Sequence, residues 1–425
     1  MPFKGACPDV RSDARTDVRP LSGKLLKSLQ SAELSLCDEA ASFLQSGFWG
    51  GFKARFGWEA MAFNAVLKSD IGSGSLLVLR RRLAPGFSLA YIPWGPELPP
   101  ELSGKFPADF SSADEARRAV LSELAEALKE LLPRDTVFIR FDPPWYGEEL
   151  NAFSPPPPFT RSGADIQPPD TVLIDLTQPM ESVMERMKPK WRYNARLALK
   201  KGVTVRRAGA EETGVFYSLL KETAGRDGIA IHSIEYYRAL LENTWYLPPR
   251  PQAEVPLRHT MAAEQPPFNL SCYARPEGTY EAKRPDIRLY LAQHEGDTLA
   301  GIVTLFRGRE AVYLYGASSD KKRSLMAPYA LQVKAMEDAK EAGCEEYDLF
   351  GIPPDDDPAH PMAGLYRFKT GFGGRIIHRP GSWDFPCRPL LYRLFRGAES
   401  FRKKLRTMKK AGKRSHAKAE SVGKQ

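Results

Sequence analysis

The sequence lacks several features that would assign it to a common class of protein. It contains no run of about 18 consecutive apolar residues, so we predict no membrane-spanning helix. Its first twenty residues lack the apolar segment of a secretory signal, which predicts a cytoplasmic location. The five cysteines and six histidines are scattered without metal-ligand spacing. We therefore expect neither a metal site nor a disulfide framework.

Acidic residues are scarce at one end only. The formal net charge is +9, yet residues 388–425 contain 13 Lys and Arg against two Glu, which leaves 48 basic and 50 acidic residues elsewhere. The basic excess thus belongs to the C-terminal tail and concerns partners rather than the fold. A length of 425 residues with 42% hydrophobic residues is typical of a folded chain with two domains.

The same order of elements occurs twice along the chain. In both places the apolar pattern predicts strands, an amphipathic helix, a further strand and a proline-containing loop. The helix and the strand after it are expected at 114–132 and 136–141 in the first copy, and at 328–342 and 345–352 in the second. We therefore predict two similar domains of the α/β (α+β) class with mixed sheets.

A basic stripe is predicted near the start of the second copy. A helix is expected from Met180, with an interruption at Pro189 and an end before Gly202. Four cations recur on it at four-residue steps, namely Lys188, Arg192, Arg196 and Lys200. Like charges at this spacing repel by about 0.2–0.5 kcal/mol per pair. Either their partners lie on another element, or the stripe binds the phosphates of a nucleic acid.

Lys53 stands among aromatic residues. A helical pattern that starts at Glu33 ends at Gly47, and Trp49 and Phe52 come just before Lys53. One interpretation is a helix end packed on the core with the lysine exposed to solvent. The other is a lysine held rigidly enough to bind a phosphate.

Five motifs occur in order between residues 40 and 385: LQSGFWGGFK (44–53), MKPKWRYNARLALKKG (187–202), RDGI (226–229), YLYGASS (313–319) and FKTGFGG (368–374). Together they resemble the FemABX family of tRNA-dependent aminoacyltransferases, which build the interpeptide bridge of peptidoglycan. The resemblance implies two tandem acetyltransferase-like (GNAT-like) domains, in agreement with the repeated order of elements. It also implies that the last strands return to the first domain.

With this fold, the chain divides into successive segments. We expect a flexible arm, a first GNAT-like domain, a second one with an insertion, a return to the first domain, and a basic amphipathic helix with a tail. Their residues are 1–32, 33–178, 179–378 (insertion 248–285), 379–387 and 388–425.

The resemblance further implies roles for particular residues. Lys53 and Arg226 would hold the phosphates of the cell-wall precursor, and Tyr315 would line the same cleft. Phe368 and Lys369 would lie at the peptide stem and the reacting ester. Aminoacyl-tRNA would be the co-substrate, with no other cofactor. The long segment 248–285, and Ala230 where an aromatic residue is expected, depart from the family and leave the acceptor open.

Transfer from an activated ester sets modest chemical demands. The enzyme needs no Ser or Cys nucleophile, but it must position an amine, remove a proton and stabilise an oxyanion. A cationic Lys369 would stabilise the charge on the carbonyl or the departing ribose oxygen. Asp142, the carboxylate that the resemblance places nearest, either accepts the proton, orients the amine, or only caps the turn before Pro143.

Two other functions fit parts of the sequence. A conventional acetyl-CoA-dependent N-acetyltransferase needs glycines in the loop before the second long helix, but DKKRSLMA (320–327) has none, which disfavours CoA binding. A non-catalytic adaptor would instead use its basic surfaces to bind RNA or an anionic membrane.

The segment after Arg388 is predicted to form a basic amphipathic helix. Its apolar stripe consists of Leu390, Leu391, Leu394, Phe395, Ala398, Phe401 and Leu405. In one interpretation the helix binds peripherally to the anionic inner face of the cell membrane, with about 1 kcal/mol from each well-placed Lys or Arg. In the other, the stripe packs on the first domain and the charges only keep the protein soluble.

Overall fold

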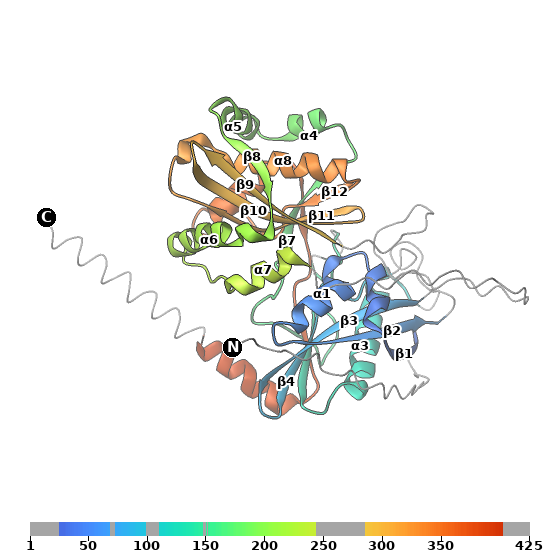
Figure 1. Ribbon diagram of the computed structural model, residues 1–425. Coiled ribbons are helices and arrows are strands. Elements are labelled where there is room, and N and C mark those ends of the chain that lie inside the picture. Colours follow the sequence, from blue (N-terminus) through green and yellow to red (C-terminus); the bar gives the residue numbers. More distant parts are fainter. Residues whose placement is uncertain are drawn as a thin grey trace, which may run out of the picture.

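The computed structural model describes residues 25–68, 73–98, 110–147, 150, 152–243 and 285–402. Two seven-stranded mixed sheets form the two halves of the molecule, one above the other in Figure 1. The predicted α/β class with two mixed sheets is therefore confirmed. The insertion expected at 248–285 lies outside the described residues apart from Pro285, and so do the first 24 residues and the tail after Arg402. No helix in the described ranges is long and apolar enough to cross a membrane.

The first sheet has the order β1-β2-β3-β4-β5-β14-β6. Its strands are β1 (Leu26–Ala32), β2 (Glu59–Leu67), β3 (Ser73–Ala84), β4 (Phe87–Ile92), β5 (Thr136–Phe141), β6 (Thr160–Arg161) and β14 (Trp383–Pro386). β4 and β5 are parallel, and the helix α3 (Ala113–Leu131) connects them. Ser112 caps α3 by accepting a hydrogen bond from the Glu115 amide at 3.1 Å.

Side chains alternate between the two faces of this sheet. On β3, Leu76 and Val78 pack in the cluster under α3, whereas Leu77 and Leu79 pack in the cluster that contains α1 (Gly47–Ala54). The second cluster also contains residues of the other half, so α1 lies between the two halves (Figure 1). The halves therefore share one hydrophobic core.

The second sheet has the order β13-β7-β12-β11-β10-β9-β8. Its strands are β7 (Asp170–Asp175), β8 (Thr204–Ala208), β9 (Asp286–His294), β10 (Asp297–Arg307), β11 (Glu310–Ser318), β12 (Glu346–Asp348) and β13 (Arg375–His378). Its helices are α4 (Met180–Arg186), α5 (Pro189–Lys200), α6 (Thr213–Asp227), α7 (Ile234–Glu242), α8 (Ala327–Glu341) and α9 (Ala363–Thr370). β11 and β12 are parallel and joined through α8, as β4 and β5 are through α3.

Three local expectations were wrong. Residues 26–32 are not part of a flexible arm, because they form β1 and pair with β2. β7 lies in the second sheet, between β13 and β12, although the expected boundary at 178 assigned it to the first domain. Residues 33–47 form no continuous helix but two short 3-10 helices, Leu34–Glu39 and Phe43–Gln45, and Ser46 then caps a new helix, α1, which begins at Gly47.

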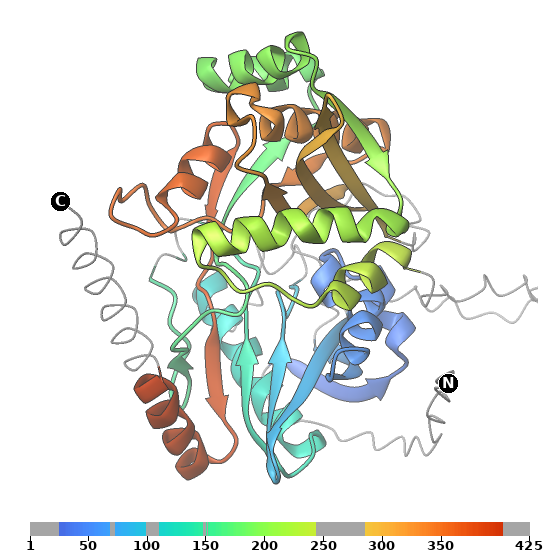
Figure 2. The ribbon, with the colours of Figure 1, turned by 60° about the vertical axis from the view of Figure 1, so that its left-hand side comes forward.

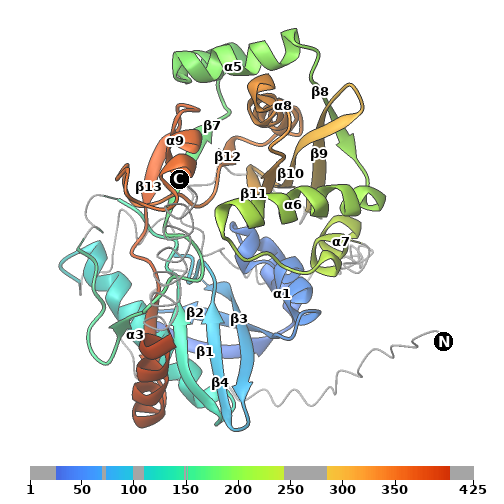
Figure 3. The same cartoon turned by 90° about the vertical axis from the view of Figure 1, so that its left-hand side faces the viewer.

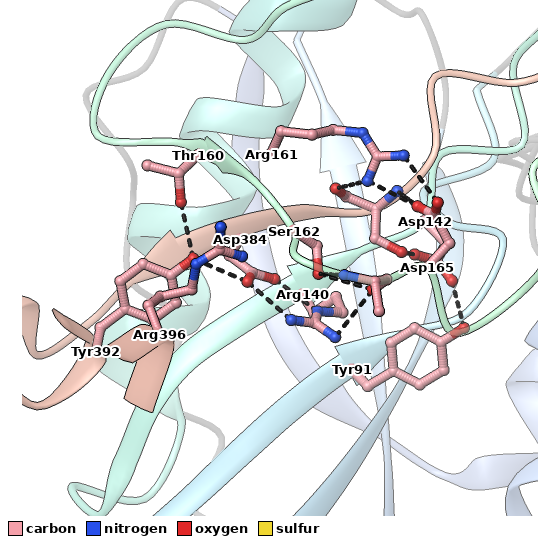
Figure 4. A network of polar contacts seen from close by, with 12 residues as sticks. Tyr91, Arg140, Asp142, Thr160, Arg161, Ser162, Asp165, Asp384, Tyr392 and Arg396 are labelled. Carbon is pink, nitrogen blue, oxygen red and sulfur yellow. Dashed lines mark hydrogen bonds and ion pairs between the residues drawn. The ribbon is translucent and has the colours of Figure 1, made fainter. Parts of the chain in front are cut away.

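The segment 379–386 joins the halves a second time. β14 pairs with β5 and β6 in the first sheet, and Asp384 on it is fully buried. Its carboxylate accepts hydrogen bonds from Arg140 Nε at 2.7 Å and Nη2 at 2.9 Å, and from the Tyr392 hydroxyl at 2.9 Å (Figure 4). This carboxylate thus connects β5 to β14 and to the helix at 389–402, which follow β5 by more than 240 residues.

We predict that Asp384→Ala lowers the free energy of unfolding by about 3–5 kcal/mol, because it leaves the buried Arg140 guanidinium without its counter-ion. Urea unfolding followed by circular dichroism measures the change. Glu126→Ala is the matched control, since it removes an exposed ion pair with Lys129 and should cost less than about 1 kcal/mol. Equal costs for the two variants would contradict the prediction.

Candidate active site

Lys369 has a buried amine that donates its hydrogen bonds to backbone carbonyls. It lies in the last turn of α9 and is only 6% exposed. Its Nζ donates hydrogen bonds to the carbonyl oxygens of Phe350 at 3.2 Å and Gly351 at 2.8 Å, and lies 5.2 Å from the centre of the Tyr313 ring. In the described part of the chain it forms no ion pair. Burial lowers the pKa of Lys369 to about 7, against a smaller opposite effect of Asp348.

A turn after β12 presents both carbonyls to this amine. Asp348 accepts hydrogen bonds from the Thr171 hydroxyl and, at 2.6 Å, from the Phe350 amide, which closes a tight turn. Phe350 adopts a left-handed backbone with φ 58°. Its ring lies 5.8 Å from that of Trp94, which follows β4 in the first half. Lys369 is therefore held where the two halves meet.

The helix of Lys369 is joined to the basic helix α5. The indole Nε1 of Trp191 on α5 donates a hydrogen bond to the Phe368 carbonyl at 2.7 Å. A Cβ at Gly371 would overlap the Trp191 ring, and one at Gly373 would overlap the Arg186 carbonyl. The glycines of the FKTGFGG motif therefore let the α4–α5 segment approach α9 closely.

The Phe368 ring also packs within this unit. Its centre lies 5.3 Å from that of Tyr329 on α8 and 5.2 Å from that of Phe372. Phe368 thus fixes α9 through both its ring and its carbonyl group.

The cations predicted on α5 lie on the surface. Lys188, Arg196 and Lys200 are exposed, and Arg192 is half-buried and donates a hydrogen bond to the Glu185 carbonyl at 2.8 Å. Over the ranges that the structure covers, none of the four forms an ion pair with a carboxylate. Figure 3 shows α5 at the end of the molecule farthest from the first half. Partners on another described element therefore do not explain the stripe.

Asp142 is a buried residue directly after β5. Its carboxylate accepts hydrogen bonds from the Tyr91 hydroxyl at 2.5 Å, the Ser382 hydroxyl, and the Gln167 amide at 3.3 Å (Figure 4). Burial raises the pKa of Asp142 to about 6, although the Ser382 and Tyr91 hydrogen bonds act in the opposite direction. Both oxygens already have partners, so the geometry favours a connecting role, in which Asp142 holds three segments together, over that of a proton acceptor.

Lys53 lies in a box of three aromatic rings. Its Nζ is 5.4 Å from the centre of the Trp49 ring, 5.7 Å from that of Trp58 and 5.6 Å from that of Tyr236. Trp49 and Trp58 come from the first half, whereas Tyr236 comes from α7 in the second. Burial lowers the pKa of Lys53 to about 8, and Arg81 lowers it further. The amine therefore lies between the halves, where it is partly shielded from solvent.

A β-bulge brings Tyr315 to this box. The register between β10 and β11 shifts between the pairs Val303–Tyr315 and Thr304–Tyr313. As a result Leu314 and Tyr315 both pack against the cluster shared by the halves, whereas Tyr313 packs against the cluster under α8. The Tyr315 hydroxyl lies 3.3 Å from that of Tyr236. Tyr315 thus lies beside the Lys53 box, and Tyr313 lies beside Lys369.

Arg226 lies apart from the Lys53 box. Its guanidinium donates hydrogen bonds to the Ser318 carbonyl at 3.1 Å and to the Asp320 carboxylate at 3.0 Å, and it also pairs with Asp227. The loop 228–233 follows the helix of Arg226 and contains His232, which stacks on Tyr236 with ring centres 3.9 Å apart. Two carboxylates already balance its charge, so a phosphate would have to compete with them.

Several residues of the site were not predicted from the sequence. Trp58 and Tyr236 complete the Lys53 box, Asp348 shapes the turn at Lys369, and Arg379 stacks on Trp94 with its Cζ 4.1 Å from the ring centre. Only Trp58 gave a signal, because it occurs in a chain segment already rich in aromatic residues. No group of three His, Cys, Asp or Glu among the described residues is arranged to hold a metal ion.

The loop before α8 is occupied by its own contacts. Lys322 and Met326 have left-handed backbones with φ 45° and 57°, and Lys322 pairs with Glu295 and Asp297. The Asp320 amide donates a hydrogen bond to Glu222 at 2.6 Å. These ion pairs fix the loop without glycine, in contrast to a loop that cradles a pyrophosphate.

Each half thus has antiparallel strands followed by a parallel pair with a helix between them, which defines a tandem GNAT-like α/β protein. The FemAB family model matches residues 158–245 and 281–400. The crystal structure of FemX has the same fold, with a TM-score of 0.62 and 20% identity over 87% of this chain and 99% of that one. The chain belongs to the FemAB family.

Curated relatives have related names. A lipid II:glycine glycyltransferase of Staphylococcus haemolyticus is 26% identical over 392 residues, which is 83% of this chain and 89% of that protein. One of Staphylococcus epidermidis is 26% identical over 389 residues, with the same coverage. Together with the family, these relatives support an acyltransferase.

We predict that Asp142→Asn changes how stability depends on pH. Because the pKa of Asp142 is raised to about 6 in the folded protein, its contribution to stability is present below about pH 4 and is lost as the pH rises through 6. Asparagine does not titrate. The difference in the free energy of unfolding, variant minus wild type, should therefore increase by about 3 kcal/mol between about pH 4 and pH 7.

The same variant tests the catalytic alternative. A connecting role predicts that acyl transfer stays within about tenfold of the wild-type rate, whereas loss of a general base costs roughly 10²–10⁴-fold. Our assignment of a connecting role to Asp142 would be contradicted by two results together. These are the same pH dependence of stability in the wild type and the Asp142→Asn variant, and a loss of transfer rate of roughly 10²–10⁴-fold in the variant.

Proposed function

We propose that the protein transfers an amino acid from aminoacyl-tRNA to the stem-peptide amine of a peptidoglycan precursor and so forms the interpeptide bridge. In this reaction the amine attacks the ester carbonyl, a C–N bond forms, the C–O bond to the ribose breaks, and the ribose oxygen leaves with a proton. The observation that carries the proposal is the rigid connection between Lys369 and the α5 stripe through Trp191 and Phe368. A phosphate-binding surface and a buried cation then belong to one unit.

Lys369 has a suitable environment for stabilising the oxyanion. Its amine is desolvated and is held by two neutral carbonyls, so its charge is not neutralised by a carboxylate contact in the described chain. Electrostatic stabilisation is strongest in such a water-poor site. As an ammonium ion, Lys369 would donate a hydrogen bond to the carbonyl oxygen or to the departing ribose oxygen.

The Lys53 box would hold the precursor's phosphates, with Tyr315 as part of its wall. An anion near Nζ would compensate for the hydration that the ammonium ion loses on burial. The rings would fix the side chain without neutralising its charge. Arg226 would join this site only if a phosphate displaced Asp227 or Asp320. The relatives' names support glycine as the first amino acid to test, and the lipid-linked precursor as the first acceptor.

We expect Lys369→Ala to reduce transfer of labelled glycine from charged tRNA to a peptidoglycan precursor by roughly 10²–10³-fold, as loss of an oxyanion donor does elsewhere. Lys340→Ala is the matched control, because Lys340 also donates a hydrogen bond to a carbonyl, that of Leu176 at 2.7 Å, but lies on α8. The ratio of the wild-type rate to the Lys369→Ala rate should fall as the pH rises through about 7, where Lys369 loses its charge; the ratio cancels the titration of the acceptor amine.

Acetyl-CoA, supplied as the alternative donor, tests the competing function. Transfer from acetyl-CoA alone would overturn the proposal in favour of an N-acetyltransferase. Absence of transfer from either donor, with tRNA binding retained, would favour a non-catalytic adaptor. A ratio of wild-type to Lys369→Ala rates that rises rather than falls through pH 7 would contradict the cationic role of Lys369.

For the α5 stripe, we predict that the double variant Arg196→Glu/Lys200→Glu binds tRNA at least tenfold more weakly. It should also reduce the slope of log affinity against log salt by about one for each phosphate that the stripe no longer neutralises. The control is Lys129→Glu/Arg134→Glu, which makes the same charge change on the first half. Equally weakened binding in both variants would show that only net charge matters.

A further inference from the structure

The C-terminal helix has one face buried in the protein. Residues 389–402 are helical, and Leu391, Tyr392 and Phe395 pack against the core shared by the halves. The centre of the Phe395 ring lies 4.9 Å from that of Phe138 on β5, and the Tyr392 hydroxyl contacts Asp384. This face fixes the helix on the first half, where Figure 2 shows it beside β14. The packing interpretation of the apolar stripe is thus correct for two of its seven residues, Leu391 and Phe395.

The opposite face of the same helix is apolar and exposed. Leu390, Leu394 and Phe401 are 76%, 70% and 63% exposed. At 100° per residue these three positions fall within about 40° of one another, and the exposed Ala398 extends the row. They are the three most exposed large hydrophobic residues in the described chain. Folding therefore leaves a continuous apolar row on the outside.

Basic residues accompany this row. Arg393 and Arg402 are exposed on the helix, and Arg388 is exposed just before it. The next 23 residues of the sequence, 403–425, contain nine Lys and Arg and one Glu. The single acidic residue of the helix, Glu399, pairs with Arg396 at 3.8 Å and lies against Gly163 of the body. The outer face therefore combines apolar side chains with positive charge only.

We propose that this outer face docks on an anionic lipid surface. Leu390, Leu394 and Phe401 would enter the boundary between headgroups and acyl chains, while Arg388, Arg393 and Arg402 would remain at the level of the anionic headgroups. The helix would lie in the plane of the surface, because its other face is fixed to the protein. The proposal does not depend on the transfer reaction, since the helix belongs to the first half and Lys369 to the second.

The chemistry of the face distinguishes a lipid surface from other partners. RNA would be bound by the arginines alone and would leave three large apolar side chains in water, as they are now. A second copy of the chain would bring the same positive charges together, which repel. An anionic lipid surface would cover the apolar side chains and also attract the positive charges. Each arginine near the surface would increase the affinity roughly fivefold.

The test is vesicle flotation of the full-length protein. We expect it to float with vesicles of phosphatidylcholine and phosphatidylglycerol and to stay in the soluble fraction with phosphatidylcholine alone. The triple variant Leu390→Gln/Leu394→Gln/Phe401→Gln should bind at least tenfold more weakly. Arg388→Gln/Arg393→Gln/Arg402→Gln should also weaken binding, and should reduce its dependence on salt.

Matched controls separate this face from exposed apolar residues in general. Tyr193→Gln/Leu199→Gln on α5 removes side chains that are 62% and 59% exposed, and it should leave flotation unchanged. The midpoint of urea unfolding should be the same for the Leu390/Leu394/Phe401 variant and the wild type, because those side chains are exposed.

Four results would overturn the proposal. They are equal flotation with neutral and anionic vesicles, unchanged flotation of the apolar variant, loss of tRNA binding instead of vesicle binding in that variant, and a dimer in light scattering that the variant abolishes. Transfer activity toward a water-soluble precursor, measured on the same variants, should stay at the wild-type level. It therefore reports on the proposed function separately.

Discussion

The contact between α1 and α7 sets the geometry of the region between the halves. Phe52 and Phe56 of the first half each lie with their ring centres 4.8 Å from that of Tyr236 in the second. Tyr236 is also one wall of the Lys53 box and the partner of Tyr315. A shift of one half against the other would therefore open the box and separate the two tyrosines, so the shared core and the candidate site depend on the same packing.

Both lysines of the site are desolvated without direct ionic partners among the described residues, and this state is costly. A buried ammonium ion loses hydration that neutral groups only partly replace. The lowered pKa values of Lys53 and Lys369 reflect that loss. An anionic ligand at either amine would recover interaction energy that the protein itself does not supply. The fold thus holds two cations whose best partners are groups on a substrate.

The sequence predicted the elements with a strong local signal and missed those that depend on tertiary contacts. The helices α3, α5 and α8 followed from apolar spacing and their breaks. The bulge at Leu314, which directs Tyr315 toward Lys53, has no local signature, because it arises from a register shift between β10 and β11. The sequence order placed β7 in the first domain. Its membership of the second sheet depends on pairing with β12 and β13, which come much later in the chain and give no local signal at β7.

The candidate site was predicted to a similar extent. Lys53 and Lys369 were identified, but only the structure shows which of their neighbours are charged. Asp142 is a strand-end carboxylate in the sequence, and its three hydrogen-bond donors come from segments up to 240 residues away. The C-terminal stripe was read as one apolar face. In the structure it divides into an inner row and an outer row, because the helix has apolar residues on opposite sides.

Asp348 shows why Lys369 keeps an available charge. A carboxylate in contact with Nζ would hold the lysine as an ion pair and compete with any substrate oxygen. Instead, Oδ1 of Asp348 accepts hydrogen bonds from both the Thr171 hydroxyl and the Phe350 amide, and the carboxylate raises the pKa of Lys369 only from a distance. The turn that Asp348 closes then supplies two neutral acceptors, which orient the amine without neutralising it. Orientation and charge are thus provided by different groups, which leaves the ammonium ion free to interact with a developing negative charge.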